Sequence, residues 1–222
     1  MSDFCYQECY FECQDGCRDN GDWWDDDNNY SEEDVIFYYE AALKQESLNI
    51  QSFHSGSLLI SEILKQDDRM CVLASRYMLI ADIDCGRNTL PYIKKLDKFV
   101  QNNGSSFRVY KTKNGMRYIQ TDLLYQGANK SAIATLEELG SDSQYIKLCS
   151  VGKRFMARLT PKIAPELAIK YYEGFYDNSF ADMAVTRFTK TVGKDEISFI
   201  LSPSICYHDA ITQAFRTSLK LQ

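Results

Sequence analysis

The chain has 222 residues, a formal net charge of −6, and 12 Phe and 15 Tyr residues in a composition that is 45% hydrophobic. This content of apolar and aromatic residues excludes a chain that is disordered throughout. No apolar run approaches the ~20 residues that a membrane-spanning helix needs. The acidic beginning lacks the features of a signal peptide or a mitochondrial presequence. We therefore expect no membrane association and a cytoplasmic location, in a cell or a virus-infected host.

Charge divides the chain into two parts. Residues 1–34 contain twelve acidic residues and one basic residue, a net of −11, whereas the other 188 residues contain 24 basic and 19 acidic residues, a net of +5. We interpret residues 1–34 as an acidic, disordered lead. Residues 35–222 are expected to form a single globular domain, because this length can bury its own core. Its core is expected at about 70–160 and an appendage at 161–222.

The lead contains four of the eight cysteines, at a constant spacing of four residues: Cys5, Cys9, Cys13 and Cys17. A structural zinc site is one interpretation, but on a single helix the outer two cysteines would lie about 18 Å apart at ~1.5 Å per residue. One tetrahedral ion cannot bind all four unless the chain reverses. Two interpretations remain: a stripe of cysteines and aromatic residues on a variable tail, with the thiols reduced in the cytoplasm, or two pairs of cysteines that bridge a protein partner or a second copy of the chain.

The first elements of the domain follow from capping and periodicity. Ser31 and the three acids after it predict a helix that runs to about residue 47. Residues 71–84 are apolar and β-branched and end in polar side chains, which predicts one long strand. Residues 90–102 have apolar side chains at helical spacing, and Gly104 is expected to end that helix.

A hairpin follows. Two strands, at 107–113 and 116–122, flank Asn114-Gly115, and Asn-Gly between alternating strands is the strongest short hairpin signal. Residues 132–139 predict a helix closed by Gly140, and residues 154–159 predict a further strand.

The resulting order, β-α-β-β-α-β, predicts the fold class. It is the order of the ferredoxin-like or RRM-like sandwich, an α+β fold with four antiparallel strands and two helices on one face. The helix at 31–47 would form an N-terminal extension. The C-terminal appendage is expected to be mainly helical, with helices at 166–175 and 208–219 and either a helix or a strand at 180–191.

Side-chain alternation predicts that the second face of this sheet is polar and open. If Asn114 and Gly115 form the hairpin loop, Lys113 pairs with Met116, and alternate side chains of both strands share a face. We call this the helix-free face. It is expected to hold Asp82, Asp84, Arg108, Tyr110, Thr112, Arg117, Arg154 and Arg158. In this fold the first strand runs antiparallel to the third and fourth, so Asp84 should meet Arg117 and Arg154 in one corner.

The segment Leu79-Ile80-Ala81-Asp82-Ile83-Asp84, followed by a helix and a Gly-containing hairpin, resembles the catalytic core of archaeo-eukaryotic primases and primase-polymerases. The resemblance covers about residues 70–160. It implies metal-dependent nucleotidyl transfer, with Asp82 and Asp84 as catalytic residues and as ligands of Mg²⁺ or Mn²⁺. Thr112 and Gly115 match the hairpin motif of that family in type, but Arg117 stands in place of its histidine. Lys153-Arg154 occupies the last strand, where the family has a third aspartate.

Three other segments resemble a bacterial family known only as uncharacterised, which implies no activity. They are Tyr110-Lys111-Thr112-x-x-Gly115-x-Arg117, Ala157-Arg158-Leu159-Thr160-Pro161-Lys162 and His208-Asp209-x-x-Thr212-x-Ala214. An HD-type phosphohydrolase would need more histidines than His54 and His208, so we interpret His208 as a cap or packing residue. The sequence has neither a Walker A motif nor a GxGxxG motif, so ATPase and dinucleotide sites are not predicted.

Three hypotheses follow for the helix-free face. In the first, Asp82 and Asp84 bind Mg²⁺ or Mn²⁺ and the protein transfers nucleotides. In the second, the face binds nucleotide or nucleic acid without catalysis: Tyr110 stacks on a base, and Thr112 and the arginines Arg108, Arg117, Arg154 and Arg158 contact phosphates. In the third, the Asp–Arg corner is an internal ion network of a partner-binding protein. The net charge of +5 permits polyanion binding without requiring it.

Overall fold

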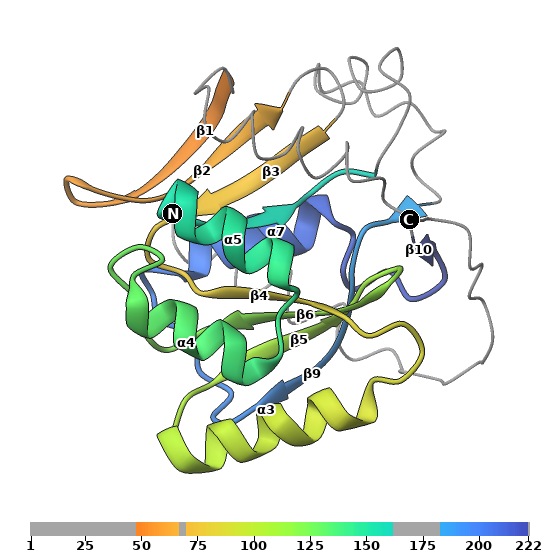
Figure 1. The fold of residues 1–222 in the computed structure, drawn as a ribbon. Helices are drawn as coiled ribbons and strands as arrows, with labels where there is room; N and C mark the ends of the chain where they lie inside the picture. Colours follow the sequence, from red (N-terminus) through yellow and green to blue (C-terminus); the bar gives the residue numbers. More distant parts are fainter. Residues whose placement is uncertain (1–47, 67–69, 162–182, 222) are drawn as a thin grey trace.

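The structure is a computed structural model, in which residues 48–66, 70–161 and 183–221 are described. The acidic lead and the predicted helices at 31–47 and 166–175 lie outside these residues. The described chain has an α+β fold with two four-stranded antiparallel sheets and four helices (Figure 1). Across the described ranges, no helix has the length and apolar character required to cross a bilayer.

Sheet A has the strand order β1-β2-β3-β7. Its strands are β1 (Leu48–Ser55), β2 (Leu58–Gln66), β3 (Met70–Ser75) and β7 (Phe155–Arg158). Successive side chains of β3 and β7 point alternately into two apolar clusters, one on each face of the sheet. Leu73, Phe155 and Ala157 face the main core, whereas Val72 and Met156 belong to a smaller cluster on the other face.

Sheet B has the strand order β4-β6-β5-β9. Its strands are β4 (Ile80–Asp84), β6 (Gly115–Gln120), β5 (Phe107–Lys111) and β9 (Arg187–Val192). Two short strands, β8 (Met183–Ala184) and β10 (Lys220–Leu221), form a separate parallel pair. Because β9 bonds to β5 throughout its length, C-terminal residues complete this sheet.

The helices are α3 (Leu90–Asn103), α4 (Lys130–Leu139), α5 (Ser143–Gly152) and α7 (Ser202–Ile211). The predictions for α3 and α4 are confirmed, including Gly104 and Gly140 as the residues that end them. Helix α3 packs on one face of sheet B, where the ring of Phe99 meets that of Phe107 at a centroid distance of 6.0 Å. The sequence analysis did not predict α5.

The prediction of a single strand at 71–84 is wrong, because the chain turns after Ser75. The Ser75 hydroxyl accepts hydrogen bonds from the backbone N–H groups of Tyr77 and Met78, at 3.1 and 3.0 Å, and donates one to the carbonyl of Ile60. This local bonding ends β3, which stays in sheet A, and the chain resumes as β4 in sheet B. Apolar composition continues through the turn because Met78 and Leu79 are buried.

The hairpin forms with a different register from the predicted one. Met116 lies opposite Lys111, not Lys113, and Tyr110 lies opposite Arg117. The Asn-Gly turn requires positive φ at both of its residues, and neither Asn114 nor Gly115 is among the described residues with positive φ. Gly115 instead permits a close approach of β4, because a Cβ atom there would lie 1.9 Å from the carbonyl oxygen of Ile83. The shift of two residues keeps the predicted faces.

The ferredoxin-like topology is not confirmed. The order β4-β6-β5 is the one expected for its first three strands, but β7, expected beside β4, is hydrogen-bonded to β3 in sheet A. The C-terminal part is also less helical than predicted, since the described residues there form β8, β9 and β10 as well as α7. The helix predicted at 208–219 begins earlier, at Ser202, and the positive φ of Gln213 follows its end.

Helix α7 lies between the two sheets, so the helix-free face is not open. Toward sheet A, Tyr207 packs against Phe53 of β1 with ring centroids 5.3 Å apart. Toward sheet B, His208 packs edge-on against Tyr110 of β5 at 4.9 Å. Burial on two sides explains why α7 lacks the single apolar stripe by which a surface helix is predicted.

Candidate functional site

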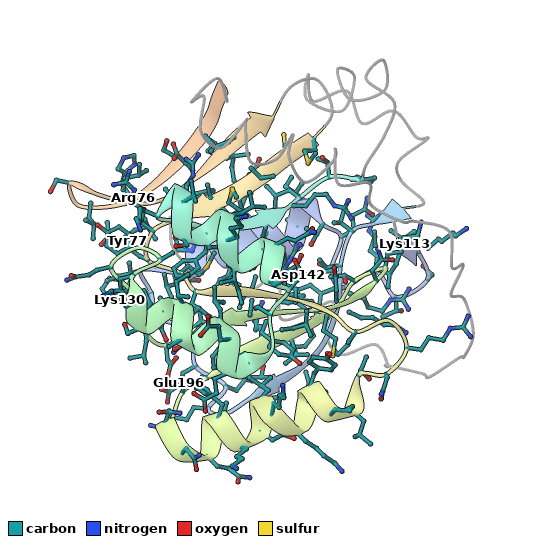
Figure 2. All side chains as sticks on the ribbon, in the orientation of Figure 1. Arg76, Tyr77, Lys113, Lys130, Asp142 and Glu196 are labelled. Atoms are coloured by element: carbon teal, nitrogen blue, oxygen red, sulfur yellow. The ribbon has the colours of Figure 1, made fainter. Side chains whose placement is uncertain are left out.

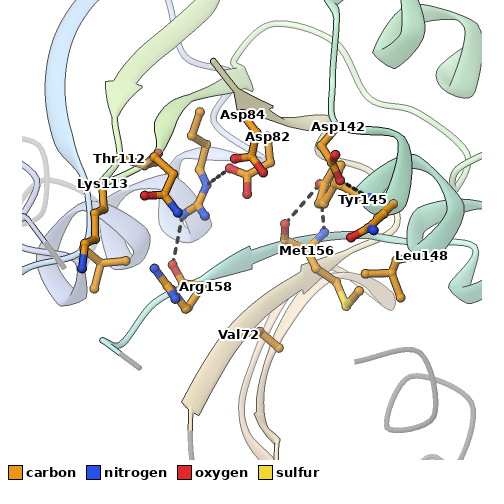
Figure 3. A pocket seen from close by; sticks show the side chains of 14 residues that line it. Val72, Asp82, Asp84, Thr112, Lys113, Asp142, Tyr145, Leu148, Met156 and Arg158 are labelled. Atoms are coloured by element: carbon orange, nitrogen blue, oxygen red, sulfur yellow. Dashed lines mark hydrogen bonds and ion pairs between the residues drawn. The ribbon is translucent and has the colours of Figure 1, made fainter. Parts of the chain in front are cut away.

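A cavity of about 240 Å³ lies where the two sheets and the start of α5 meet (Figure 3). The structure brings together five of the predicted site residues, which all line it: Asp82, Asp84, Thr112, Arg117 and Arg158. They come from β4, the β5–β6 hairpin and β7. The cavity therefore contains part of the predicted face.

Arg117 contacts Asp82, and not Asp84 as predicted. Asp82 and Arg117 are cross-strand partners of β4 and β6, and Nε of Arg117 lies 3.3 Å from Oδ1 of Asp82. Nη1 of Arg117 donates to the carbonyl of Arg158 at 3.0 Å and lies 3.5 Å from Nε2 of His208. The Arg117 side chain is only 4% exposed, whereas that of Asp82 is 35% exposed. Arg117 thus fixes Asp82 in place, and its guanidinium is too buried to serve as a freely accessible phosphate ligand.

Asp84 has a different environment, although it shares a face of β4 with Asp82. Its side chain is exposed at the cavity, and no described side chain forms a hydrogen bond or an ion pair with it. Partial loss of water, followed by the charges of Asp82 and Asp142, raises the pKa of Asp84 to about 6, against an opposing effect of Arg158. The cavity therefore holds negative charge that the protein does not fully neutralise.

Positive charge lies across the cavity from these acids. Lys113 extends from the tip of the β5–β6 hairpin, and Arg158 ends β7 (Figures 2 and 3). Both residues are partly exposed. Thr112 and Asn114 line the same side and offer a hydroxyl and an amide. The cavity thus has one acidic wall and one basic wall.

Helix α5 contributes residues to the cavity that were not predicted from the sequence. Asp142 is the N-cap of α5 and accepts a hydrogen bond from the Tyr145 backbone N–H at 2.8 Å. The Tyr145 hydroxyl lies 2.7 Å from the carbonyl oxygen of Ile80 in β4 and 3.3 Å from the backbone nitrogen of Met156 in β7, so it ties the two sheets together. An Asp after the Gly140 stop, with apolar residues three and four positions apart behind it, was an available N-cap signal.

Three predicted site residues lie away from the cavity. Tyr110 is fully buried between His208 and Phe188, so it cannot stack on a base. Arg108 donates to the carboxylate of Asp209 beneath α7. Arg154, which was expected to meet Asp84, instead contacts Glu62 of β2 at 3.4 Å, because β7 pairs with β3 in sheet A.

A buried polar network extends from the cavity under α7. His208 Nδ1 lies 2.9 Å from Oδ1 of Asp209, and both side chains are at most 1% exposed. Burial lowers the pKa of His208 despite the nearby Asp209 carboxylate. A neutral ring that donates from Nδ1 to Asp209 leaves Nε2 as an acceptor facing Arg117. His208 is thus a packing residue, as predicted, and it also orients Arg117.

The oxygen donors of the acidic wall fit a hard divalent cation. Mg²⁺ is commonly held by one or two carboxylates together with phosphate oxygens and water. Asp82 and Asp84 supply two carboxylates from one strand, and Arg158 only partly offsets the charge of Asp84. No group of three or more His, Cys, Asp or Glu side chains in the described ranges is arranged to hold a metal by itself. A cation bound at Asp82 and Asp84 would therefore need further oxygen atoms from a second bound molecule, such as one that carries phosphate groups.

The raised pKa of Asp84 predicts a pH-dependent effect of Asp84→Asn. As the pH falls toward 4 the difference between the variant and the wild type should shrink, because Asp84 becomes protonated in the folded protein and then, around its ordinary pKa of 3.8, in the unfolded chain. Above pH 6 the folded wild type carries the unfavourable charge, so the variant should be more stable, by about 1 kcal/mol or less for this exposed group. Thermal melts between pH 4 and pH 8 measure the difference. Glu137→Gln, at an exposed site on α4, should show no such divergence; equal melts of Asp84→Asn and wild type at pH 8 would contradict the prediction.

Comparisons of the chain with protein-family models, with curated proteins and with solved structures found no match. The resemblance to primases therefore stays a prediction that rests on the Asp82–Asp84 segment and the hairpin after it.

Proposed function

We propose that the cavity binds the phosphate groups of a nucleotide or of a nucleic-acid strand. A divalent cation, Mg²⁺ or Mn²⁺, would be held between those phosphates and the carboxylates of Asp82 and Asp84. The observation that carries this proposal is the incompletely neutralised Asp84 carboxylate, which faces a cavity with cationic side chains on the other wall. A phosphate ligand with its metal ion complements both walls, whereas a simple anion or a simple cation complements only one.

Each charged residue has a separate task in this proposal. Asp82 and Asp84 bind the cation, and Arg117 holds Asp82 in position through the 3.3 Å contact. Lys113 and Arg158 contact phosphate oxygens, Lys113 as a point charge and Arg158 as a fork. Thr112 donates a hydrogen bond from its hydroxyl.

Nucleotidyl transfer is the catalytic extension of this proposal, and it follows the resemblance to primases. Bound divalent cations can activate an attacking hydroxyl and stabilise leaving pyrophosphate. The β4-β6-β5 order, with Asp82 and Asp84 at the end of the first of these strands, supports an RRM-like relationship. Asp142, from the start of α5, is the only additional carboxylate on the described lining, where the resemblance implies a third aspartate on a strand.

An internal ion network is the second candidate function, and one observation favours it. Arg117 is buried, and it contacts Asp82, the carbonyl of Arg158 and His208 at once. In that case the corner stabilises the junction of the two sheets, and the protein acts through a partner. Divalent cations and nucleotides would then have no effect on it.

Equilibrium binding distinguishes the two candidates. Labelled nucleoside triphosphate and a labelled single-stranded oligonucleotide are titrated with the protein in Mn²⁺ and in EDTA. We expect binding of one or both in Mn²⁺. Asp82→Ala/Asp84→Ala should weaken it by more than the 10–100-fold that loss of a metal's outer partner causes. Asp97→Ala, an exposed acid of α3, is the matched control and should bind normally.

The proposal is overturned if the wild type binds neither the nucleoside triphosphate nor the oligonucleotide. It is also overturned by binding that neither EDTA nor the double variant changes. Incubation with a primed template and the four nucleoside triphosphates then tests the catalytic extension: extension of the primer by the wild type, lost in the double variant, supports nucleotidyl transfer. No extension by the wild type restricts the function to binding.

A further inference from the structure

The cavity has a third wall, which is apolar. Val72 of β3, Leu148 of α5 and Met156 of β7 line it, and all three belong to the small apolar cluster on the outer face of sheet A. In Figure 3 they lie together, with Asp82 and Asp84 above them and Lys113 and Arg158 to one side. Pure phosphate recognition requires no apolar surface. The wall therefore offers a surface to an apolar part of a ligand whose phosphates occupy the charged walls.

The sequence places apolar and charged side chains next to one another on the same elements. Met156 and Arg158 are two residues apart on β7, so they share a face and are separated by about 6.6 Å along the strand. Val72 is the cross-strand partner of Arg158. A ligand that contacts both Arg158 and the apolar side chains must have its phosphate and its apolar group a few ångströms apart. In a nucleotide, the ribose provides this separation.

Helix α5 adds a polar group to the edge of the apolar wall. Gln144 and Leu148 are four residues apart, so they project from the same side of the helix, and both line the cavity. Gln144 is exposed and its amide both donates and accepts hydrogen bonds. An amide beside an apolar surface can contact the edge of a planar heterocycle whose face rests on that surface.

We propose that the apolar wall and Gln144 bind the base of a single nucleotide and select among bases without a template. This inference rests on the proposed function, because the phosphates must occupy the charged walls. The sulfur of Met156 and the methyl groups of Leu148 and Val72 contact the base, as sulfur and aliphatic groups do with aromatic rings. The volume, about 240 Å³, is below the ~300–1,000 Å³ of drug-sized sites, so we assign one base and not two to the apolar wall.

Calorimetric titration in Mn²⁺ tests this inference with four nucleoside triphosphates, inorganic tripolyphosphate and a single-stranded oligonucleotide. We expect at least one nucleoside triphosphate to bind about tenfold or more tightly than tripolyphosphate, with unequal affinities among the four. Leu148→Ala should remove most of the tenfold advantage and leave tripolyphosphate binding unchanged. Gln144→Ala should equalise the four bases. Val151→Ala, at an exposed position of α5 outside the cavity lining, is the matched control and should change nothing.

The outcomes separate this inference from the proposed function. Equal binding of tripolyphosphate and every nucleoside triphosphate overturns base recognition and leaves phosphate binding standing. Base recognition is also overturned, with phosphate binding retained, if the oligonucleotide binds and the mononucleotides do not. A Leu148→Ala variant with a normal melting temperature that binds every ligand equally more weakly leads to the same conclusion. If Leu148→Ala unfolds, Gln144→Ala alone decides, because its side chain is exposed; an unchanged base preference then overturns the inference. Absence of binding to any ligand overturns both proposals.

Discussion

Replacement of Arg108 by Met should lower the free energy of unfolding by about 3–5 kcal/mol, the cost of leaving one member of a buried ion pair without its partner. Asp209, a residue of α7 that accepts a hydrogen bond from Arg108, is 1% exposed. Met keeps most of the packing that the Arg108 side chain makes near the rings of Phe188 and Phe215. The loss therefore reports mainly the uncompensated charge of Asp209. Chemical denaturation at neutral pH measures it.

An exposed ion pair supplies the matched control. Lys190 of β9 contacts Asp97 of α3 at 3.8 Å, and both side chains are more than 40% exposed. Lys190→Met should cost about 1 kcal/mol or less. The double variant Arg108→Met/Asp209→Leu should recover much of the stability lost by the single variant, because it removes both buried charges. If Arg108→Met costs no more than Lys190→Met, the pair is not the stabilising element that its burial indicates.

The second large effect concerns ligand binding, and it separates two arginines that the sequence analysis treated alike. Arg158→Gln should weaken binding of nucleoside triphosphate by about 10- to 100-fold, the equivalent of ~1.5–3 kcal/mol for a charged hydrogen bond to phosphate. Arg154→Gln should leave the affinity unchanged, because Arg154 contacts Glu62 outside the cavity. Arg158 is the last residue of β7 and Arg154 immediately precedes the strand, so the two variants flank the same short segment.

The measurement is the same Mn²⁺-dependent titration for both variants, repeated at two salt concentrations. Loss of a phosphate contact should also reduce the salt dependence of binding in Arg158→Gln, because fewer ions are displaced. Equal weakening in both variants would show that the loss comes from distortion of β7. No weakening in either would remove Arg158 from the binding role.

Glycine positions and apolar periodicity correctly predicted those helices whose ends are set by residues nearby in the sequence. Helix α3 ends at Gly104 and α4 ends at Gly140, and both ends were predicted from glycine and periodicity. The shared face of Asp82, Asp84 and Arg117 was also predicted, because a two-residue error in the hairpin register leaves alternate side chains on the same face. The expected contact was wrong by one pair, since Arg117 lies opposite Asp82 and not Asp84.

Long-range pairing was not predictable from the same signals. Residues 71–84 are apolar throughout, and only the Ser75 hydroxyl, bonded to the next turn, divides them between two sheets. Nothing in the composition of β7 indicates that it joins β3 and not β4, yet that choice moves Arg154 out of the site and brings Arg158 in. Helix α7 was placed too late because burial on both sides removes the periodicity that prediction needs.

The position of α7 between the sheets has a consequence for the order in which the protein can be completed during synthesis. A chain that leaves the ribosome from its N-terminus exposes every strand of sheets A and B, the last being β9 at Arg187–Val192, before α7 at Ser202–Ile211 has emerged. Until then the inner faces of both sheets lack their shared partner and present apolar surface to water. A ribosome-bound chain halted after β9 is therefore expected to be a better chaperone client than the released protein, although it contains both sheets.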